Sequence, residues 1–265
     1  MRLEATPRFR GGKGSQVLLL HAAWTSWRIW TPILEQLAAE RDVLAITMCG
    51  HFGGPAQPFN RENVEKQILG ELDAAGFDRP HVVGNSIGAY LALELAKQGR
   101  FRSVVALAPK GKQTRAHGEA LARKMIREHH FLRGSLPLIR MGIHIPAFRK
   151  SAMSALSAQG DRLPVPLCDH LLRAFAFTDA AHILKTNITE AGPIPHIGDA
   201  SAIKCPVLFV RGDRDGLVER DEIARYRADI PHAELIELQN CGHSPQLDYP
   251  DLIAQEILRF TRQGK

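Results

Sequence analysis

Short runs of apolar and β-branched residues recur along the chain, and each has the length and composition of a buried strand. They are bounded by polar residues, glycine or proline. The predicted strands are residues 17–20, 43–47, 81–83, 103–107, 207–210 and 234–238.

Longer stretches between most of these runs carry apolar residues at helical spacing. Ile29, Ile33, Leu34 and Leu37, for example, fall on one side of a helix. Strands that alternate with helices predict βαβ units, and hence an α/β fold with a mostly parallel sheet covered on both faces. The predicted helices are residues 27–41, 60–75, 86–98, 220–229 and 251–262.

The alternation breaks once, between residues 111 and 196. Here the pattern is helical or irregular, and prolines such as Pro137, Pro146 and Pro164 punctuate short segments. Most loops in a compact sheet have about 4–6 residues, so this stretch is too long for a plain connection. We therefore expect residues 1–110 and 197–265 to form the core, with 111–196 inserted as a helical cap.

Composition adds little to this picture. The 265 residues are 45% apolar and 23% charged, as in an ordinary soluble enzyme or binding domain. No stretch has the length of a signal peptide's apolar region or of a membrane span, so we expect a cytoplasmic protein with no integral membrane association. The four cysteines are far apart and predict neither a zinc site nor a disulfide framework.

The net charge of +6 is concentrated in one region. Between Lys110 and Lys150 there are ten Lys or Arg residues and only two acids, Glu119 and Glu128. Such a segment suits an anionic substrate or an acidic membrane surface, although a solvated basic face explains it equally well. We expect no nucleic-acid partner, because aromatic residues do not interleave with the basic ones.

The first candidate for chemistry is the turn Gly84-Asn85-Ser86-Ile87-Gly88, which follows a predicted strand and opens a predicted helix. This G-x-S-x-G pattern is typical of a nucleophile elbow, in which a strained turn holds the serine hydroxyl out at the edge of the sheet. Taken alone, the pattern also fits an inert turn of small residues.

Two later loops offer a base and an acid. His243 follows the last predicted strand, so it belongs at the carboxyl edge of the sheet, where ligands bind in open α/β folds. The strand at 207–210 leads to two acids, Asp213 and Asp215. We favour Asp215 as the group that orients the imidazole, because Asp213 has the position of a turn-forming residue.

An oxyanion site is predicted from the first parallel strand. The loop after residues 17–20 reads His21-Ala22-Ala23-Trp24, and an N–H from this loop can point at the same place as the N–H of Ile87. Two such donors would stabilise the negative oxygen that forms when a serine attacks a carbonyl.

Together these four loops resemble the α/β-hydrolase superfamily, and the resemblance covers nearly the whole chain except the cap. Their chain order is Ser, Asp, His, unlike that of chymotrypsin or subtilisin. The resemblance implies Ser86 as nucleophile, His243 as general base and then acid, Asp215 as orienting acid, Ala23 and Ile87 as oxyanion donors, and no metal or organic cofactor.

Two residues depart from the usual pattern of that superfamily. Ala22 stands where glycine is usual, which puts the oxyanion loop in question. Asn85 stands where many esterases have histidine, and it is also familiar from the superfamily's carbon–carbon bond hydrolases, which act on dienoates. It is a weak pointer to that second activity.

Substrate-binding residues are expected at three places. Trp24 follows the oxyanion loop, and the loop with His51 and Phe52 resembles the superfamily's segment that borders the pocket. Met125 lies on one side of an amphipathic basic segment of the cap. A separate Cys49–His51 catalytic pair is not favoured, since no orienting group is visible.

The expected activity is hydrolysis of a carboxylic ester or thioester of a small to medium acyl group through a Ser86 acyl-enzyme. The substrate is a small molecule, and an anionic one would suit the basic cap. Two alternatives stay open: a carbon–carbon bond hydrolase of dienoates, and a non-catalytic relative that binds a small molecule. The sequence indicates no oligomeric state.

Overall fold

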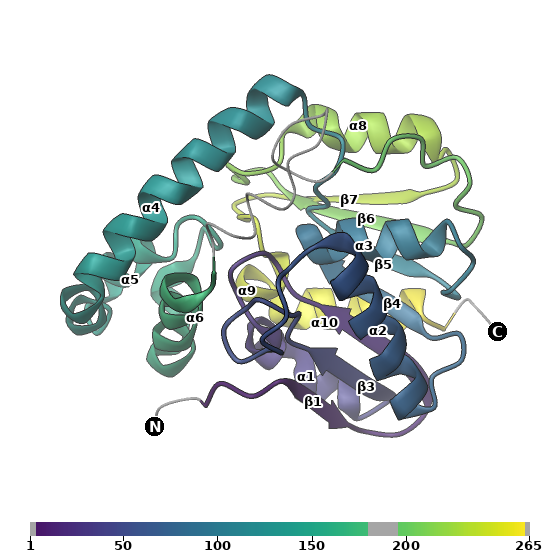
Figure 1. Cartoon of the computed structure of the whole chain (residues 1–265), viewed down its shortest axis with the longest axis horizontal. Helices are drawn as coiled ribbons and strands as arrows, with labels where there is room; N and C mark the ends of the chain where they lie inside the picture. Colours follow the sequence, from purple (N-terminus) through teal and green to yellow (C-terminus); the bar gives the residue numbers. More distant parts are fainter. Residues whose placement is uncertain (1–3, 180–195, 263–265) are drawn as a thin grey trace.

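One seven-stranded sheet forms the centre of the molecule (Figure 1). The computed structural model describes residues 4–179 and 196–262. Neighbouring strands pair in parallel in the order β1-β3-β2-β4-β5-β6-β7, except that β1 runs antiparallel to β3. The strands are β1 (Arg8–Gly11), β2 (Ser15–Leu20), β3 (Arg41–Ile46), β4 (His81–Asn85), β5 (Val104–Leu107), β6 (Val207–Gly212) and β7 (Glu234–Leu238).

Helices cover both faces of this sheet, as the sequence predicts. One face packs against α2, α3 and α8, and the other against α1 and α10. The helices of the core are η1 (Trp27–Trp30), α1 (Thr31–Ala38), α2 (Arg61–Ala75), α3 (Ile87–Ala96), α8 (Arg220–Asp229), α9 (Pro245–Asp248) and α10 (Pro250–Phe260).

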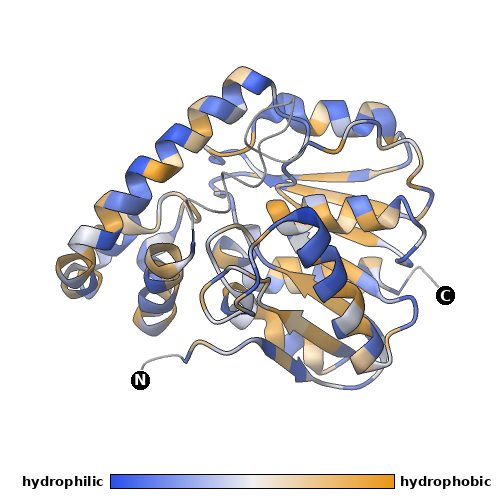
Figure 2. Cartoon of the chain, viewed as in Figure 1, coloured by the Kyte–Doolittle hydropathy of each residue, from blue (hydrophilic) through white to orange (hydrophobic). Residues whose placement is uncertain are grey.

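Alternation along the strands builds two hydrophobic layers. In β2, Leu18 and Leu20 join the layer under α2 and α3, whereas Val17 and Leu19 join the layer under α1 and α10. All four side chains are fully buried. The inner strands are accordingly mostly hydrophobic, while the helices mix apolar and polar residues (Figure 2). The mostly parallel, doubly covered sheet is therefore confirmed.

The turn from β4 into α3 needs glycine at two positions. A Cβ on Gly84 would lie 2.4 Å from the backbone N of Ala89, and one on Gly88 would lie 2.2 Å from the carbonyl oxygen of Leu20. Both distances are far below van der Waals contact. The two glycines let α3 begin directly against the ends of β2 and β4, which brings Ser86 to the carboxyl edge of the sheet.

Replacing Gly88 with alanine is therefore expected to lower the free energy of unfolding by about 3 kcal/mol or more. Urea unfolding of wild type and variant measures this difference. Gly70 is the matched control, because it lies in α2 and a Cβ there meets nothing within 4 Å. Gly70→Ala should raise stability by up to about 1 kcal/mol. Equal stability of the two variants would contradict the steric explanation of the turn.

Among the described residues between β5 and β6, four helical segments gather beside one end of the sheet (Figure 1). The longest passes through Pro137, where the sequence pattern predicts an interruption. Pro137 is exposed, whereas the neighbouring Leu136 is buried in the layer that also contains Leu167 and Leu171, so packing holds the helix together there. The segments are α4 (Arg115–Gly142), α5 (Pro146–Ala152), η2 (Gly160–Arg162) and α6 (Val165–Phe177).

Other differences from the predicted elements are small. β1 escapes prediction because Phe9 is its only large apolar residue, as suits an edge strand. Residues 27–41 divide into η1, α1 and the start of β3. Part of the expected cap, residues 180–195, lies outside the described residues. Within the described ranges, no helix combines the length and the apolar character that crossing a bilayer requires.

Candidate active site

Ser86 occupies a strained position at the carboxyl end of β4. Its φ of 57° and ψ of −113° lie outside the regions that L-residues favour, and its N–H donates to the carbonyl of Leu107, 2.9 Å away. The residue is 6% exposed, and its side chain lines a cavity. The strain is of the kind that persists where the surrounding structure holds a residue for function.

His243 and Asp215 form a buried pair at the same edge of the sheet. The Nδ1 atom of His243 lies 2.9 Å from Oδ2 and 3.1 Å from Oδ1 of Asp215. The side chains are 2% and 0% exposed. An ionised carboxylate can only accept hydrogen bonds, so Nδ1 carries the proton and Nε2 is free to act as a base.

The surroundings of Asp215 favour the ionised form of its carboxyl group. Burial by itself raises its pKa, but the His243 ring and the N–H groups of Leu217 and Val218 outweigh burial and hold the pKa below its usual value. These N–H groups donate to Oδ1 over 2.8 and 3.1 Å. The carboxylate therefore stays charged at neutral pH and is fixed in orientation.

Asp213, the other acid of this loop, has a different place. Its Oδ1 accepts a hydrogen bond from the N–H of Cys241 at 3.1 Å, which ties the β6 loop to the loop that carries His243. Asp213 has no hydrogen bond to the imidazole. Of the two acids, only Asp215 is positioned to orient His243.

Ser86 and His243 line the same cavity, but among the described residues the Ser86 hydroxyl makes no hydrogen bond. Catalytic hydrogen bonds are often long before a substrate binds. Ser86 and His243, the expected nucleophile and base, thus line one cavity, and His243 is already hydrogen-bonded to Asp215.

Ala23 and Ile87, the residues expected to supply the oxyanion donors, both line the cavity that Ser86 lines. Ile87 is the first residue of α3, so its N–H has no partner within the helix, and Ala23 lies in the loop after β2. Neither N–H donates to another described residue. Ala22 fits this loop, because the left-handed position there belongs to Trp24, with φ of 61°. The loop is held instead by Thr25, whose hydroxyl donates to the Ala22 carbonyl at 2.7 Å.

Asn85 has a structural role that the sequence does not reveal. Its amide nitrogen donates to the carbonyls of Leu107 and His243, and its oxygen accepts from Ser244 and Gln246, all between 2.9 and 3.1 Å. The side chain is fully buried and does not line the cavity. Asn85 joins β4 to the loop that carries His243, and this role explains its presence without reference to the substrate.

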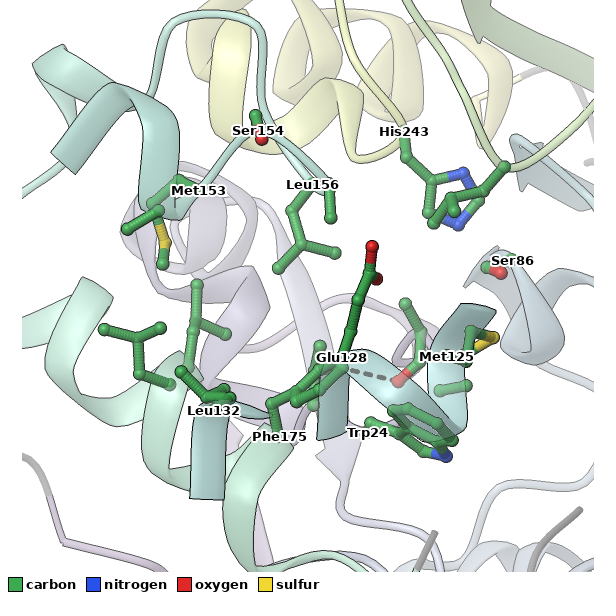
Figure 3. Close-up of a pocket in the computed structure, with 18 of the residues that line it drawn as sticks. Trp24, Ser86, Met125, Glu128, Leu132, Met153, Ser154, Leu156, Phe175 and His243 are labelled. Carbon is green, nitrogen blue, oxygen red and sulfur yellow. Dashed lines mark hydrogen bonds between the residues drawn. The ribbon is translucent and has the colours of Figure 1, made fainter. Parts of the chain in front are cut away.

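The cavity has a volume of about 510 Å³ and lies between the catalytic edge of the sheet and α4, α5 and α6. Its lining is mostly apolar, and Trp24 and Met125 are part of it, as the sequence predicts (Figure 3). Trp24 packs edge-on against Phe175, with ring centroids 4.8 Å apart. Further apolar lining residues are Leu121, Leu132, Ile139, Leu156, Leu171 and Leu172.

His51 and Phe52 lie outside this cavity. The His51 ring meets the rings of His21 and Phe59 edge-on, with centroids 4.8 and 5.1 Å away. Phe52 packs against Phe177 at 5.8 Å. The structure thus separates these two residues from Ser86, whereas Trp24 and Met125 share its cavity.

His51 should make the protein less stable in acid. Burial lowers its pKa to about 4, against the smaller effect of hydrogen bonds to backbone carbonyls. In the unfolded chain the pKa is about 6.5, so the folded state binds fewer protons, and stability is lost as pH falls from about 6.5 toward 4. We expect His51 to account for about 2 kcal/mol of unfolding free energy lost between pH 7.5 and 5.0. Urea unfolding at both pH values tests this. His51→Gln should shrink the difference by that amount, and an unchanged difference would refute the assignment.

A buried ion pair stands beside the cavity. Lys110 Nζ lies 2.7 Å from Glu222 Oε1, and the two side chains are 7% and 0% exposed. In the described part of the chain, one cluster of possible metal ligands consists of His117, Glu219 and Glu222, and only Glu222 is buried. Lys110 already neutralises Glu222, and Glu219 lies 3.3 Å from His117. The cluster therefore carries no metal assignment.

Comparison with known proteins places this arrangement in context. A model described as the alpha/beta hydrolase family matches residues 17–256. That range includes all four loops described above.

The individual relatives described next have low sequence identity to this chain, and their names give different activities. Epoxide hydrolase EphH of Mycobacterium tuberculosis is 28% identical over 207 residues, covering 76% of this chain and 93% of that protein. A pimeloyl-acyl-carrier-protein methyl ester esterase of Xanthomonas campestris is 25% identical over 266 residues, covering 94% and 96%. The solved structure of a thermophilic esterase from Thermogutta terrifontis has a TM-score of 0.75 at 19% identity, covering 100% of this chain and 99% of that one, which shows a shared fold.

Proposed function

The chain belongs to the alpha/beta hydrolase family, and from this premise we propose that it is a serine hydrolase of carboxylic esters or thioesters. The observation that carries the proposal is the convergence of three groups on one cavity. Ser86 stands on a strained turn, His243 is hydrogen-bonded to Asp215, and the cavity is also lined by Ala23 and Ile87, whose N–H groups have no partner among the described residues.

The proposed reaction has two steps. Ser86 Oγ attacks the ester carbonyl while His243 Nε2 takes its proton, and the N–H groups of Ala23 and Ile87 stabilise the oxyanion. The C–O or C–S bond then breaks as His243 gives the proton to the leaving alcohol or thiol. Water, deprotonated by His243, then attacks the acyl-enzyme, and His243 returns this proton to Ser86 Oγ as the bond to the acid breaks. Asp215 holds the ring and stabilises its charged form throughout.

The apolar cavity supports an acyl group of small to medium size. Its volume falls within the range of small-molecule sites, about 300–1,000 Å³. We propose that residues 111–196 act as the cap that defines this group, since α4, α5 and α6 supply most of the apolar lining. The ester activity of the Xanthomonas relative agrees with this substrate class.

A panel of substrates tests the proposal. 4-Nitrophenyl esters of increasing acyl length are compared with a styrene-oxide-type epoxide, because the Mycobacterium relative is an epoxide hydrolase, and with a dienoate. We expect turnover of esters, with kcat/KM rising with chain length until the cavity is filled. Turnover of the epoxide or the dienoate alone would reject the ester assignment, and turnover of none would favour a non-catalytic binder.

A further inference from the structure

Glu128 is an acid on the cavity wall that the proposed reaction does not use. It lies on α4 at helical spacing from Leu121, Met125 and Leu132, so it shares their inward face. Figure 3 shows its carboxylate pointing into the cavity, on the side where Ser86 and His243 lie. A lone carboxylate on an otherwise apolar face has no evident role in packing.

The other charged groups around the cavity leave Glu128 with only one weak ion pair. Lys110, the one lining residue with a permanent positive charge, is buried and pairs with Glu222 at 2.7 Å. Lys124 reaches Glu128 only at 3.9 Å, and both side chains are more than 40% exposed, so that pair is weak. Glu128 is therefore the one carboxylate among the described lining residues, and its ion pair is weak enough for a ligand cation to compete with Lys124.

We propose that Glu128 forms a cation-binding subsite, and that the substrate carries an ammonium or similar cationic nitrogen within reach of its ester carbonyl. The partly exposed ring of Phe175 lines the same cavity and can contact the apolar surface and charge of a quaternary ammonium. The part of this inference that concerns the ester of the substrate rests on the proposed function. Binding of a cation at Glu128 does not depend on the reaction.

The same carboxylate selects against anionic substrates. A carboxylate in this cavity would face Glu128 without a free lysine or arginine on the described wall to pair with it. Like charges brought together in a partly dry site oppose binding. The basic segment between Lys110 and Lys150 thus does not make the cavity itself favourable for anions.

Binding of three matched probes tests the subsite without reference to catalysis. Octyltrimethylammonium, octanol and octanoate share a chain and differ in head-group charge, and calorimetry below their micelle concentrations gives their affinities for the full chain. We expect the cation to bind about tenfold more tightly than the alcohol, and octanoate to bind more weakly than the alcohol. Equal or reversed affinities would overturn the inference.

Two variants locate the effect at Glu128. Glu128→Gln should reduce the preference for the cation about tenfold and strengthen octanoate binding. Glu119→Gln is the matched control, since it removes the same charge from the same helix at a residue outside the cavity lining. An equal effect of both variants would assign the preference to the general field of the cap and contradict the subsite.

Kinetics distinguish failure of the subsite from failure of the proposed function. Wild type and Glu128→Gln are compared on acylcholine and matched neutral alkyl esters. If esters are hydrolysed with no change in preference on substitution, the subsite fails and the hydrolase stands. If no ester is hydrolysed but the cation preference persists in binding, the ester assignment fails and the subsite stands.

Discussion

Replacing Ser86 with alanine is expected to lower kcat/KM for ester hydrolysis by about 10⁴- to 10⁶-fold. In the proposed reaction the hydroxyl attacks the carbonyl, and Ser86 is the one hydroxyl-bearing residue of the described cavity wall with a positive φ. Because this hydroxyl makes no hydrogen bond among the described residues, the unfolding free energy should change by less than about 1 kcal/mol.

Ser154 provides the matched control for this variant. It lines the same cavity, but it lies in the segment between α5 and η2 rather than on the catalytic edge of the sheet. Ser154→Ala should keep kcat/KM within about threefold of wild type. Steady-state kinetics on the best ester of the panel measures both variants, and a Ser86→Ala enzyme with near wild-type kcat would remove Ser86 from the reaction.

The second large effect is expected for Asp215→Asn, which should lower kcat by about 10⁴-fold. An asparagine oxygen can still accept from the N–H groups of Leu217 and Val218, which leaves its amide nitrogen facing His243 Nδ1. That nitrogen donates a hydrogen bond, so His243 Nδ1 must accept it and the imidazole proton must lie on Nε2. In this form His243 cannot take the proton of Ser86.

Asp213→Asn separates this chemical effect from a structural one. Asp213 lies two residues away and anchors the N–H of Cys241, so the amide preserves an acceptor there. We expect kcat to fall by no more than about tenfold, with a loss of about 1 kcal/mol in stability. A larger kinetic loss in Asp213→Asn than in Asp215→Asn would reverse the assignment of the two acids.

The loops of the candidate active site could be located from sequence because each of them follows a strand of the parallel sheet. In a parallel sheet the carboxyl ends of all strands meet at one edge, so Ser86, Asp215 and His243, each following a strand, converge there. The rule needs only the strand pattern, and buried parallel strands have the most evident pattern in the chain.

The other cavity residues could be predicted only in part, because they depend on packing between distant segments: Trp24 and Met125 line the cavity as expected, whereas His51 and Phe52 do not. His51 has the sequence position of a pocket residue but packs against Phe59 instead. Glu128 counted only toward the charge of a basic segment, although its spacing from Leu121 and Leu132 already put it on their apolar face. Which face of α4 turns toward the sheet is decided by its contacts with α6, which local sequence does not show.

Covalent labelling with a fluorophosphonate, followed by peptide mass spectrometry, tests the central claim most directly because it requires no knowledge of the substrate. The account predicts one modified residue, Ser86, with labelling lost in Ser86→Ala and slowed by at least about 10³-fold in His243→Ala. Labelling at another serine, or at Ser86 with the same rate in His243→Ala, would contradict a serine nucleophile activated by His243.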